Sequence, residues 1–319
     1  MASCGGSNMN KDDRIYVAGH QGLAGSAIVR ELERNGYKSI LARRHADLDL
    51  RDQRATRAFF EETKPDCVFL AAGKVGGIMA NNTYKAEFIF DNIMIAANVI
   101  DSAYRTGVRR LLNLGSSCIY PRDAPQPMKE DMMLTGPLES TNEPYAVAKI
   151  AAIKLCRYYC EQYGTNFLSV MPTNLYGPND NFDTVSSHVL PALIRKMHDA
   201  KRQSGQVTLW GDGTPRREFL YVDDFARAVV FLMERCEVKE VGEFMNIGMG
   251  TDVTIKELAE TVAEIVGYTG RIEWDLTKPN GTPRKLLDVS RIRALGWEPT
   301  TQLREGLERT YRSFLKDGV

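Results

Sequence analysis

The chain has 319 residues, and its 41 Lys or Arg residues are balanced by 41 Asp or Glu residues, so its formal net charge at pH 7 is zero. A neutral chain has no overall electrostatic attraction for nucleic acid or for an anionic membrane. No apolar run approaches the roughly 20 residues that a membrane-spanning helix needs. We therefore expect neither nucleic acid nor a membrane among its partners.

The N-terminal segment, residues 1–13, is small and polar and lacks the apolar stretch of a secretory signal. We expect it to form a disordered tail. Six cysteines are scattered along the chain without the spacing of a disulfide framework or of a zinc site. The sequence therefore predicts reduced thiols, no bound metal and a cytoplasmic location.

Between residues 14 and 172, short apolar runs alternate with amphipathic helical runs. Such alternation predicts a parallel sheet with helices on both faces. Strands are expected at residues 14–18, 38–42, 67–71, 110–115 and 166–171, and helices at 22–35, 53–64, 83–106 and 144–163. The predicted fold class is α/β, with a doubly wound Rossmann sheet over residues 14–172. A smaller mixed α/β substrate-binding domain is expected over residues 173–319, with segments that can cross between the two parts.

A glycine-rich turn follows the first predicted strand directly and opens the first predicted helix. Its residues are Gly19, His20, Gln21, Gly22, Leu23, Ala24 and Gly25. This spacing gives a tight turn, lets the backbone approach a pyrophosphate and places the phosphate at a helix N-terminus. Three glycines alone are weak support, but the strand before them and the helix after them favour a dinucleotide cofactor.

The end of the second predicted strand indicates which dinucleotide is bound. NAD-binding proteins usually carry Asp or Glu there, whereas this chain carries Arg43 and Arg44. Two guanidinium groups can hold a 2′-phosphate through paired hydrogen bonds. The sequence therefore predicts NADP(H), although a solvated surface pair is the alternative for these arginines.

Tyr145 and Lys149 lie four residues apart near the start of a predicted helix, so they share one face. A nearby ammonium is expected to lower the pKa of the phenol toward a useful range. Ser116 and Ser117 end the fourth predicted strand, and ligands of doubly wound sheets bind beyond the carboxyl ends of the strands. The glycine-rich turn, the serines and the Tyr/Lys pair are thus expected to meet in one crevice.

With these motifs the chain resembles the extended short-chain dehydrogenase/reductases, with Ser116, Tyr145 and Lys149 in the catalytic Ser/Tyr/Lys roles. More closely, it resembles the GDP-L-fucose synthase family of 3,5-epimerase/4-reductases. The matching stretches are A-A-G-K-V-G-G-I-M-A-N-N-T-Y (71–84), G-S-S-C-I-Y-P (115–121), N-E-P-Y-A-V-A-K (142–149), M-P-T-N-L-Y-G-P (171–178), W-G-D-G-T-P-R-R-E-F (210–219) and K-P-N-G-T-P-R-K (278–285).

The resemblance implies that Cys118 and His188 form the acid/base pair for epimerisation of GDP-4-keto-6-deoxy-D-mannose. Inverting a carbon needs one group to remove a proton and another to deliver one to the opposite face. Cys118 is favoured as the base, and the division of roles stays open. Without the resemblance, Cys118 reads as a buried thiol and His188 as a polar residue at a helix start.

The resemblance also implies further ligand contacts. Besides the glycine-rich turn and the two arginines, the cofactor is expected to contact Leu114, Gly115, Ser116, Ser117, Lys149, Pro172, Thr173, Asn174, Leu175 and His188. The substrate is expected to contact Lys196, Trp210, Arg217 and Asn280. The resemblance also implies a homodimer, in which the helices at 83–106 and 144–163 pair with their copies, although the apolar residues there could instead serve only the monomer core.

Three alternatives stay open. A 4,6-dehydratase would need acidic partners where this chain has S-S-C-I-Y-P, and a 4-epimerase would retain NAD and need no Cys/His pair. A non-catalytic NADP sensor on the same fold would typically lose the Tyr/Lys pair that is present here. Fold alone does not choose among these functions.

Overall fold

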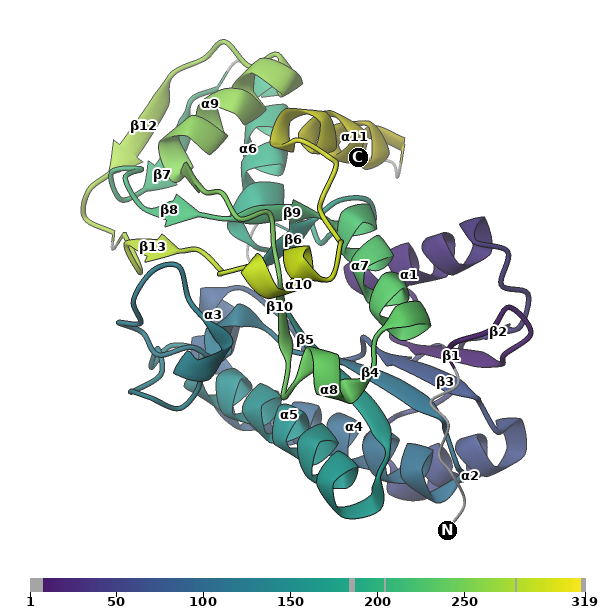
Figure 1. Cartoon of the computed structure of the whole chain (residues 1–319). Coiled ribbons are helices and arrows are strands. Elements are labelled where there is room, and N and C mark those ends of the chain that lie inside the picture. Colours follow the sequence, from purple (N-terminus) through teal and green to yellow (C-terminus); the bar gives the residue numbers. More distant parts are fainter. Residues whose placement is uncertain (1–7, 184–186, 204, 279, 317–319) are drawn as a thin grey trace.

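The computed structural model describes residues 8–183, 187–203, 205–278 and 280–316. Its centre is a six-stranded parallel sheet in the order β10-β5-β4-β3-β1-β2 (Figure 1). The strands are β1 (Ile15–Ala18), β2 (Ile40–Leu41), β3 (Cys67–Leu70), β4 (Arg110–Leu114), β5 (Asn166–Pro172) and β10 (Met245–Ile247). The chain therefore returns to the first sheet long after Pro172, and β10 pairs with β5.

Helices cover both faces of this sheet. One face carries α1 (Leu23–Arg34) and α7 (Val222–Arg235), and the other carries α2 (Gln53–Thr63), α4 (Lys85–Arg105) and α5 (Glu143–Tyr163). Side chains alternate between faces along each strand. In β1, Ile15 and Val17 pack with α1 and α7, whereas Tyr16 and Ala18 pack with the other helices.

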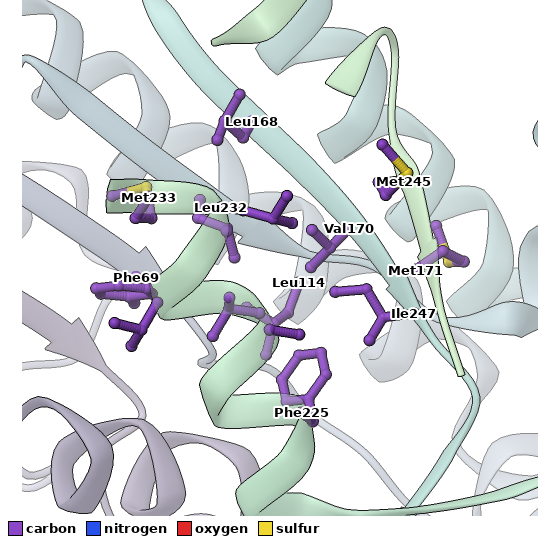
Figure 2. Packing of buried hydrophobic residues seen from close by; sticks show 14 of the residues in the cluster. Phe69, Leu114, Leu168, Val170, Met171, Phe225, Leu232, Met233, Met245 and Ile247 are labelled. Carbon is purple, nitrogen blue, oxygen red and sulfur yellow. The ribbon is translucent and has the colours of Figure 1, made fainter. Parts of the chain in front are cut away.

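The α7 face is filled by closely packed apolar side chains. Figure 2 shows Phe69, Leu114 and Val170 from three neighbouring strands opposite Phe225 and Leu232 of α7. All five side chains are buried. Burying each large apolar side chain stabilises the packing of α7 on the sheet by about 1.5–3 kcal/mol. This helix belongs to the second half of the sequence.

The second half forms a smaller body beyond the strand ends. Three helices, α6 (Val189–Gln203), α9 (Ile255–Val266) and α11 (Leu303–Lys316), share a separate apolar cluster. Around them lie three small sheets built from β7 (Val207–Trp210) with β12 (Ile272–Asp275), β6 (Asn174–Tyr176) with β9 (Phe219–Tyr221), and β8 (Arg216–Arg217) between β11 (Val253–Thr254) and β13 (Arg284–Lys285). No helix in the described ranges is both long and apolar enough to cross a membrane.

The remaining elements are short. They are α3 (Ile78–Thr83), α8 (Val238–Val241), α10 (Ser290–Ala294) and the 3-10 turns η1 (Ser117–Ile119) and η2 (Glu130–Met132). The sequence pattern gave one helix over 83–106, whereas α3 and α4 are separate and Tyr84 lies between them. Thr254 and Glu257 form a capping box at the start of α9, with both of its hydrogen bonds present.

Part of the expected disordered tail is ordered, which corrects the prediction for residues 8–13. Met9 is 5% exposed and belongs to the apolar cluster under α7, and its amide donates to the Met233 carbonyl over 3.3 Å. Asp13 pairs with Arg109 at 2.5 Å. The burial of Met9 could not be predicted from the sequence, because one large apolar residue among small polar ones forms no helix or strand periodicity. Residues 1–7 lie outside the described part of the chain.

Because Met9 fills core space, the substitution Met9→Ala should lower the free energy of unfolding by about 2 kcal/mol or more. The control is Met79→Ala, since Met79 is 54% exposed and its truncation should change stability by less than about 0.5 kcal/mol. Urea unfolding followed by circular dichroism measures both. Equal stabilities for the two variants would contradict the packing of this segment.

Candidate active site

The glycine-rich turn joins β1 to α1 at the carboxyl end of the sheet. Gly19 has φ +82°, and a Cβ there would lie 2.8 Å from the Ala72 backbone. A Cβ on Gly25 would lie 2.1 Å from the Gly19 carbonyl oxygen, so Gly25 is required for close packing of α1. Gly22 is different, because its nearest heavy atom would be 3.6 Å away. Protein packing therefore requires glycine at 19 and 25, whereas a Cβ at position 22 would make only an ordinary van der Waals contact.

The start of α1 suits a phosphate. Gly22 is the N-cap of α1, and no side chain caps the helix there. The first amide groups of a helix have no partner within the helix and carry partial positive charge, so they bind anions. The residues present thus suit the pyrophosphate of a dinucleotide.

The two arginines after β2 differ in their surroundings. Arg44 makes two hydrogen bonds to the Asp47 carboxylate, at 2.8 and 3.1 Å. Arg43 donates to the Ala42 carbonyl at 2.9 Å, and its guanidinium lies 5.4 Å from the centre of the Phe59 ring. A 2′-phosphate would have to compete with Asp47 for Arg44, whereas Arg43 is bound only to a neutral carbonyl and a ring.

The end of β4 and the start of α5 bring the expected catalytic side chains together. The Lys149 ammonium donates to the carbonyl of Leu114, the last residue of β4, over 2.8 Å, and lies 5.7 Å from the centre of the Tyr145 ring. Ser116 lies close enough to Tyr145 and to Cys118, which follows in η1, to lower the pKa values of both. Gly115 and Ser117 flank Ser116, and a Cβ on Gly115 would lie 2.4 Å from the Met171 side chain.

Burial dominates the acid–base properties of this cluster. It raises the pKa of Tyr145, and the Ser116 hydrogen bond only partly offsets this. It also raises the pKa of Cys118, which Ser116, Lys285 and Lys149 counteract. It lowers the pKa of Lys149 to about 8. The expected lowering of the Tyr145 pKa is therefore wrong, because desolvation of the phenol has the largest effect and raises this pKa.

A second loop at the sheet edge contains Pro172, Thr173, Asn174 and Leu175. Pro172 ends β5, and the Thr173 amide donates to the Ile247 carbonyl of β10 over 3.0 Å. The loop continues as β6, which pairs with β9. The loop lies at the carboxyl end of β5, next to β4, and its contact with the cofactor stays a prediction.

The remaining predicted residues lie on the smaller body. His188 immediately precedes α6, and its side chain is accessible to solvent. The protein around it still desolvates the imidazole enough to lower its pKa. Within the described ranges, it makes no hydrogen bond to Ser116, Cys118 or Tyr145. Lys196, on α6, donates to the Thr208 carbonyl over 3.4 Å.

Trp210 and Asn280 flank one turn of the smaller body. Trp210 ends β7 and is 53% exposed, so it is not a core residue. Lys278 lies over its ring at 5.8 Å. The Asn280 side chain accepts a hydrogen bond from the Asp212 amide over 2.9 Å. Asn280 thus holds the turn that follows Trp210.

Lys285 was not singled out from the sequence. It pairs in register with Arg217 across β13 and β8, and its charge acts on the pKa of Cys118. Two cations therefore lie on adjacent strands, with Lys285 close enough to act on Cys118 of η1, and such a pair suits a diphosphate. In the sequence, Lys285 appears only as the last residue of the matching stretch K-P-N-G-T-P-R-K, and no periodic pattern of apolar residues marks it as part of a strand.

The buried ammonium of Lys149 makes stability depend on pH. Since its pKa falls from 10.5 in a free lysine to about 8 on folding, the unfolded chain binds this proton more tightly. Stability should therefore rise as the pH increases from about 8 to 10.5, by up to about 3 kcal/mol. Unfolding of the parent protein and of Lys149→Met across this range should show the extra slope only in the parent, and parallel curves would refute the shift.

Comparisons with known proteins agree with this geometry. Residues 15–248 match the NAD dependent epimerase/dehydratase family. The chain is 55% identical over 312 residues to GDP-L-fucose synthase 1 of Arabidopsis thaliana, covering 98% of this chain and 96% of that one.

Two solved structures are also similar. A GDP-6-OMe-4-keto-L-xylo-heptose reductase from C. jejuni has a TM-score of 0.93 and 35% identity, covering 98% of this chain and 100% of that one. A GDP-L-fucose synthetase from Naegleria fowleri bound to NADP has a TM-score of 0.88 and 29% identity, covering 97% and 95%. The chain belongs to the NAD dependent epimerase/dehydratase family and, within it, to the GDP-L-fucose synthases.

Proposed function

We propose that this protein converts GDP-4-keto-6-deoxy-D-mannose to GDP-L-fucose by 3,5-epimerisation followed by NADPH-dependent 4-reduction. The observation that carries the proposal is the meeting of Ser116, Cys118, Tyr145 and Lys149 at the carboxyl end of β4. A keto-reductase needs the Ser/Tyr/Lys set, and an epimerase needs an additional proton-transfer group beside it. Relatives that share this chain's whole length carry the same activity in their names.

The cofactor is NADP(H). The amide groups at the start of α1 hold its pyrophosphate, and Arg43 holds the 2′-phosphate. Lys149 binds the nicotinamide ribose beside the loop 172–175. When bound, NADPH supplies the hydride that reduces the ketone.

Epimerisation depends on the acidity of the protons next to the C4 ketone. Ser116 and Tyr145 donate hydrogen bonds to the C4 oxygen and so stabilise the enolate that forms when C3 or C5 loses a proton. Cys118 removes the proton from one face, and His188 delivers a proton to the other. The cations Lys285 and Lys149 favour the thiolate that this base requires.

The raised pKa of Tyr145 suits the second reaction. A phenol that stays protonated can give its proton to the C4 oxygen as the carbonyl is reduced. Lys149 keeps its ammonium beside the ring and can stabilise the phenolate left behind. The nucleotide-sugar diphosphate binds Arg217 and Lys285, with Lys196, Trp210 and Asn280 around it.

A 4-reduction without epimerisation is the second candidate. It is favoured by the similarity to a keto-heptose reductase. The presence of Cys118 within reach of Ser116 favours the two-step reaction instead. The 4,6-dehydratase, 4-epimerase and non-catalytic sensor are less well supported, because the reductase set is intact and the expected acidic partners of a dehydratase are missing from residues 115–121.

We also propose a homodimer that joins α4 and α5 to their copies. These helices pack against each other, and their outer surface exposes Phe90, Val147 and Tyr158. Exposed aromatic residues are typical of subunit contacts. Sedimentation velocity distinguishes the dimer from a monomer.

The cytoplasmic location stays a prediction from the sequence.

The substitution Cys118→Ser should abolish GDP-L-fucose formation, since a serine hydroxyl ionises far less readily than a thiol and cannot supply the anionic base at neutral pH. NADPH oxidation with GDP-4-keto-6-deoxy-D-mannose measures turnover, and fluorescence titration measures NADPH binding, which should not change. The parent protein must oxidise NADPH with this substrate for the proposed function to stand. Undiminished product formation by the variant would remove Cys118 from the mechanism.

The two arginines should contribute unequally to cofactor choice. Arg43→Ala should raise the Kd for NADPH about tenfold or more and leave that for NADH almost unchanged, because only NADPH carries the 2′-phosphate. Arg44→Ala should have the smaller effect, since Asp47 already holds Arg44. Equal losses for both variants would show that Arg44 leaves Asp47 to bind the phosphate.

A further inference from the structure

Glu218 is a carboxylate buried between the two halves of the molecule. It directly follows Arg217, separates β8 from β9, and is 0% exposed. One carboxylate oxygen accepts a hydrogen bond from the Gly250 amide over 2.6 Å, and the other accepts from the Leu287 amide over 3.0 Å. In the described part of the chain no Lys or Arg forms an ion pair with it, so these amides provide its main compensation.

The backbone of Glu218 makes contacts of its own. Its carbonyl oxygen accepts from the Thr173 hydroxyl over 3.2 Å and from the Asn174 side-chain amide over 2.8 Å. Both donors belong to the loop beyond β5. A single residue thus joins this loop, the turn after β10 and the segment that follows β13.

The contacts of Glu218 lie next to two cationic residues. Arg217 precedes Glu218, and Lys285 lies two residues before Leu287 and in register with Arg217. Resting on the function proposed above, we propose that Glu218 is a positioning residue that fixes Arg217 and Lys285 relative to the loop 172–175. It thereby sets the distance between the diphosphate of the nucleotide-sugar and the point at which its ketone meets Ser116 and Tyr145.

The chemistry of the site explains why a carboxylate is used. Two converging amide donors need two acceptors, and an ionised carboxylate supplies both in one rigid group. Burial raises the pKa of Glu218, and the bonds from Leu287 and Gly250 oppose this shift. Gly248 adjoins the same carboxylate, since a Cβ at 248 would lie 2.3 Å from one of its oxygens.

The first test is Glu218→Gln. The glutamine amide group would face a backbone N–H without an acceptor, so one of the two segments should move. The Kd for GDP, measured by calorimetry, should rise about tenfold or more. The Kd for NADPH should stay within about twofold, because the start of α1 and Arg43 lie outside the contacts of Glu218. The KM for GDP-4-keto-6-deoxy-D-mannose should rise by a larger factor than kcat falls.

Asp224→Asn is the matched control. Asp224 is also buried, at 2% exposed, and also accepts from two backbone amides, those of Thr300 and Thr301. It lies on α7, pairs with Arg227 and, in the described part of the chain, makes no hydrogen bond or ion pair with Arg217 or Lys285. Its replacement should cost stability in a similar way and leave the Kd for GDP unchanged.

A second variant reaches the carboxylate without removing it. The Cβ introduced by Gly248→Ala would displace the Glu218 side chain, so this variant should show the same selective loss of GDP binding. If Glu218→Gln fails to fold, the Gly248→Ala variant tests the positioning role of Glu218 in its place. Normal Kd for GDP and normal KM in a folded Glu218→Gln or Gly248→Ala protein would overturn the positioning role. A parent protein that binds GDP and NADPH but does not turn over the keto-sugar would instead overturn the proposed function.

Discussion

The hydrogen bond from the Lys149 ammonium to the Leu114 carbonyl ties α5 to the last residue of β4. Everything else in the catalytic cluster depends on it. It places Tyr145, one helical turn earlier, over the segment in which Ser116 and Cys118 follow the strand. The ammonium is deeply buried and has no carboxylate partner among the described ion pairs, so its charge remains available to the groups around it. A desolvated cation costs free energy, and active sites are where such costs are retained.

A second requirement is that two halves of the chain share one rigid frame. The strand β10 and the helix α7 come from the second half in sequence, yet they complete the first sheet and cover one of its faces. Glu218 adds polar contacts across the same boundary. The cofactor loop at 172–175 and the cations Arg217 and Lys285 are therefore held by one connected set of packed and hydrogen-bonded residues. Chemistry on a bound sugar ring needs that rigidity, because small errors in placement are costly.

The sequence predicted the features that depend on local pattern. Alternating apolar runs located β1 to β5 and the helices α1, α2, α4 and α5 to within a few residues, and glycine spacing located the turn before α1, whereas β10 and α7 were not predicted. Features set by distant contacts were missed. The burial of Met9 depends on a cluster built mainly from α7, and the pairing of Lys285 with Arg217 joins strands of two residues that carry no periodic signal. The direction of the Tyr145 pKa was also missed, since the desolvation of a phenol depends on everything packed around it.

The arrangement of Cys118 beside the reductase set is what separates a two-step enzyme from a simple reductase. The most direct test is to run the reaction of GDP-4-keto-6-deoxy-D-mannose and NADPH in deuterated water and to analyse the product by NMR. Proton exchange through Cys118 and His188 should leave solvent deuterium at both C3 and C5, while C4 receives its hydrogen from NADPH. A reduced product with ordinary hydrogen at C3 and C5 and unchanged configuration there would contradict the account.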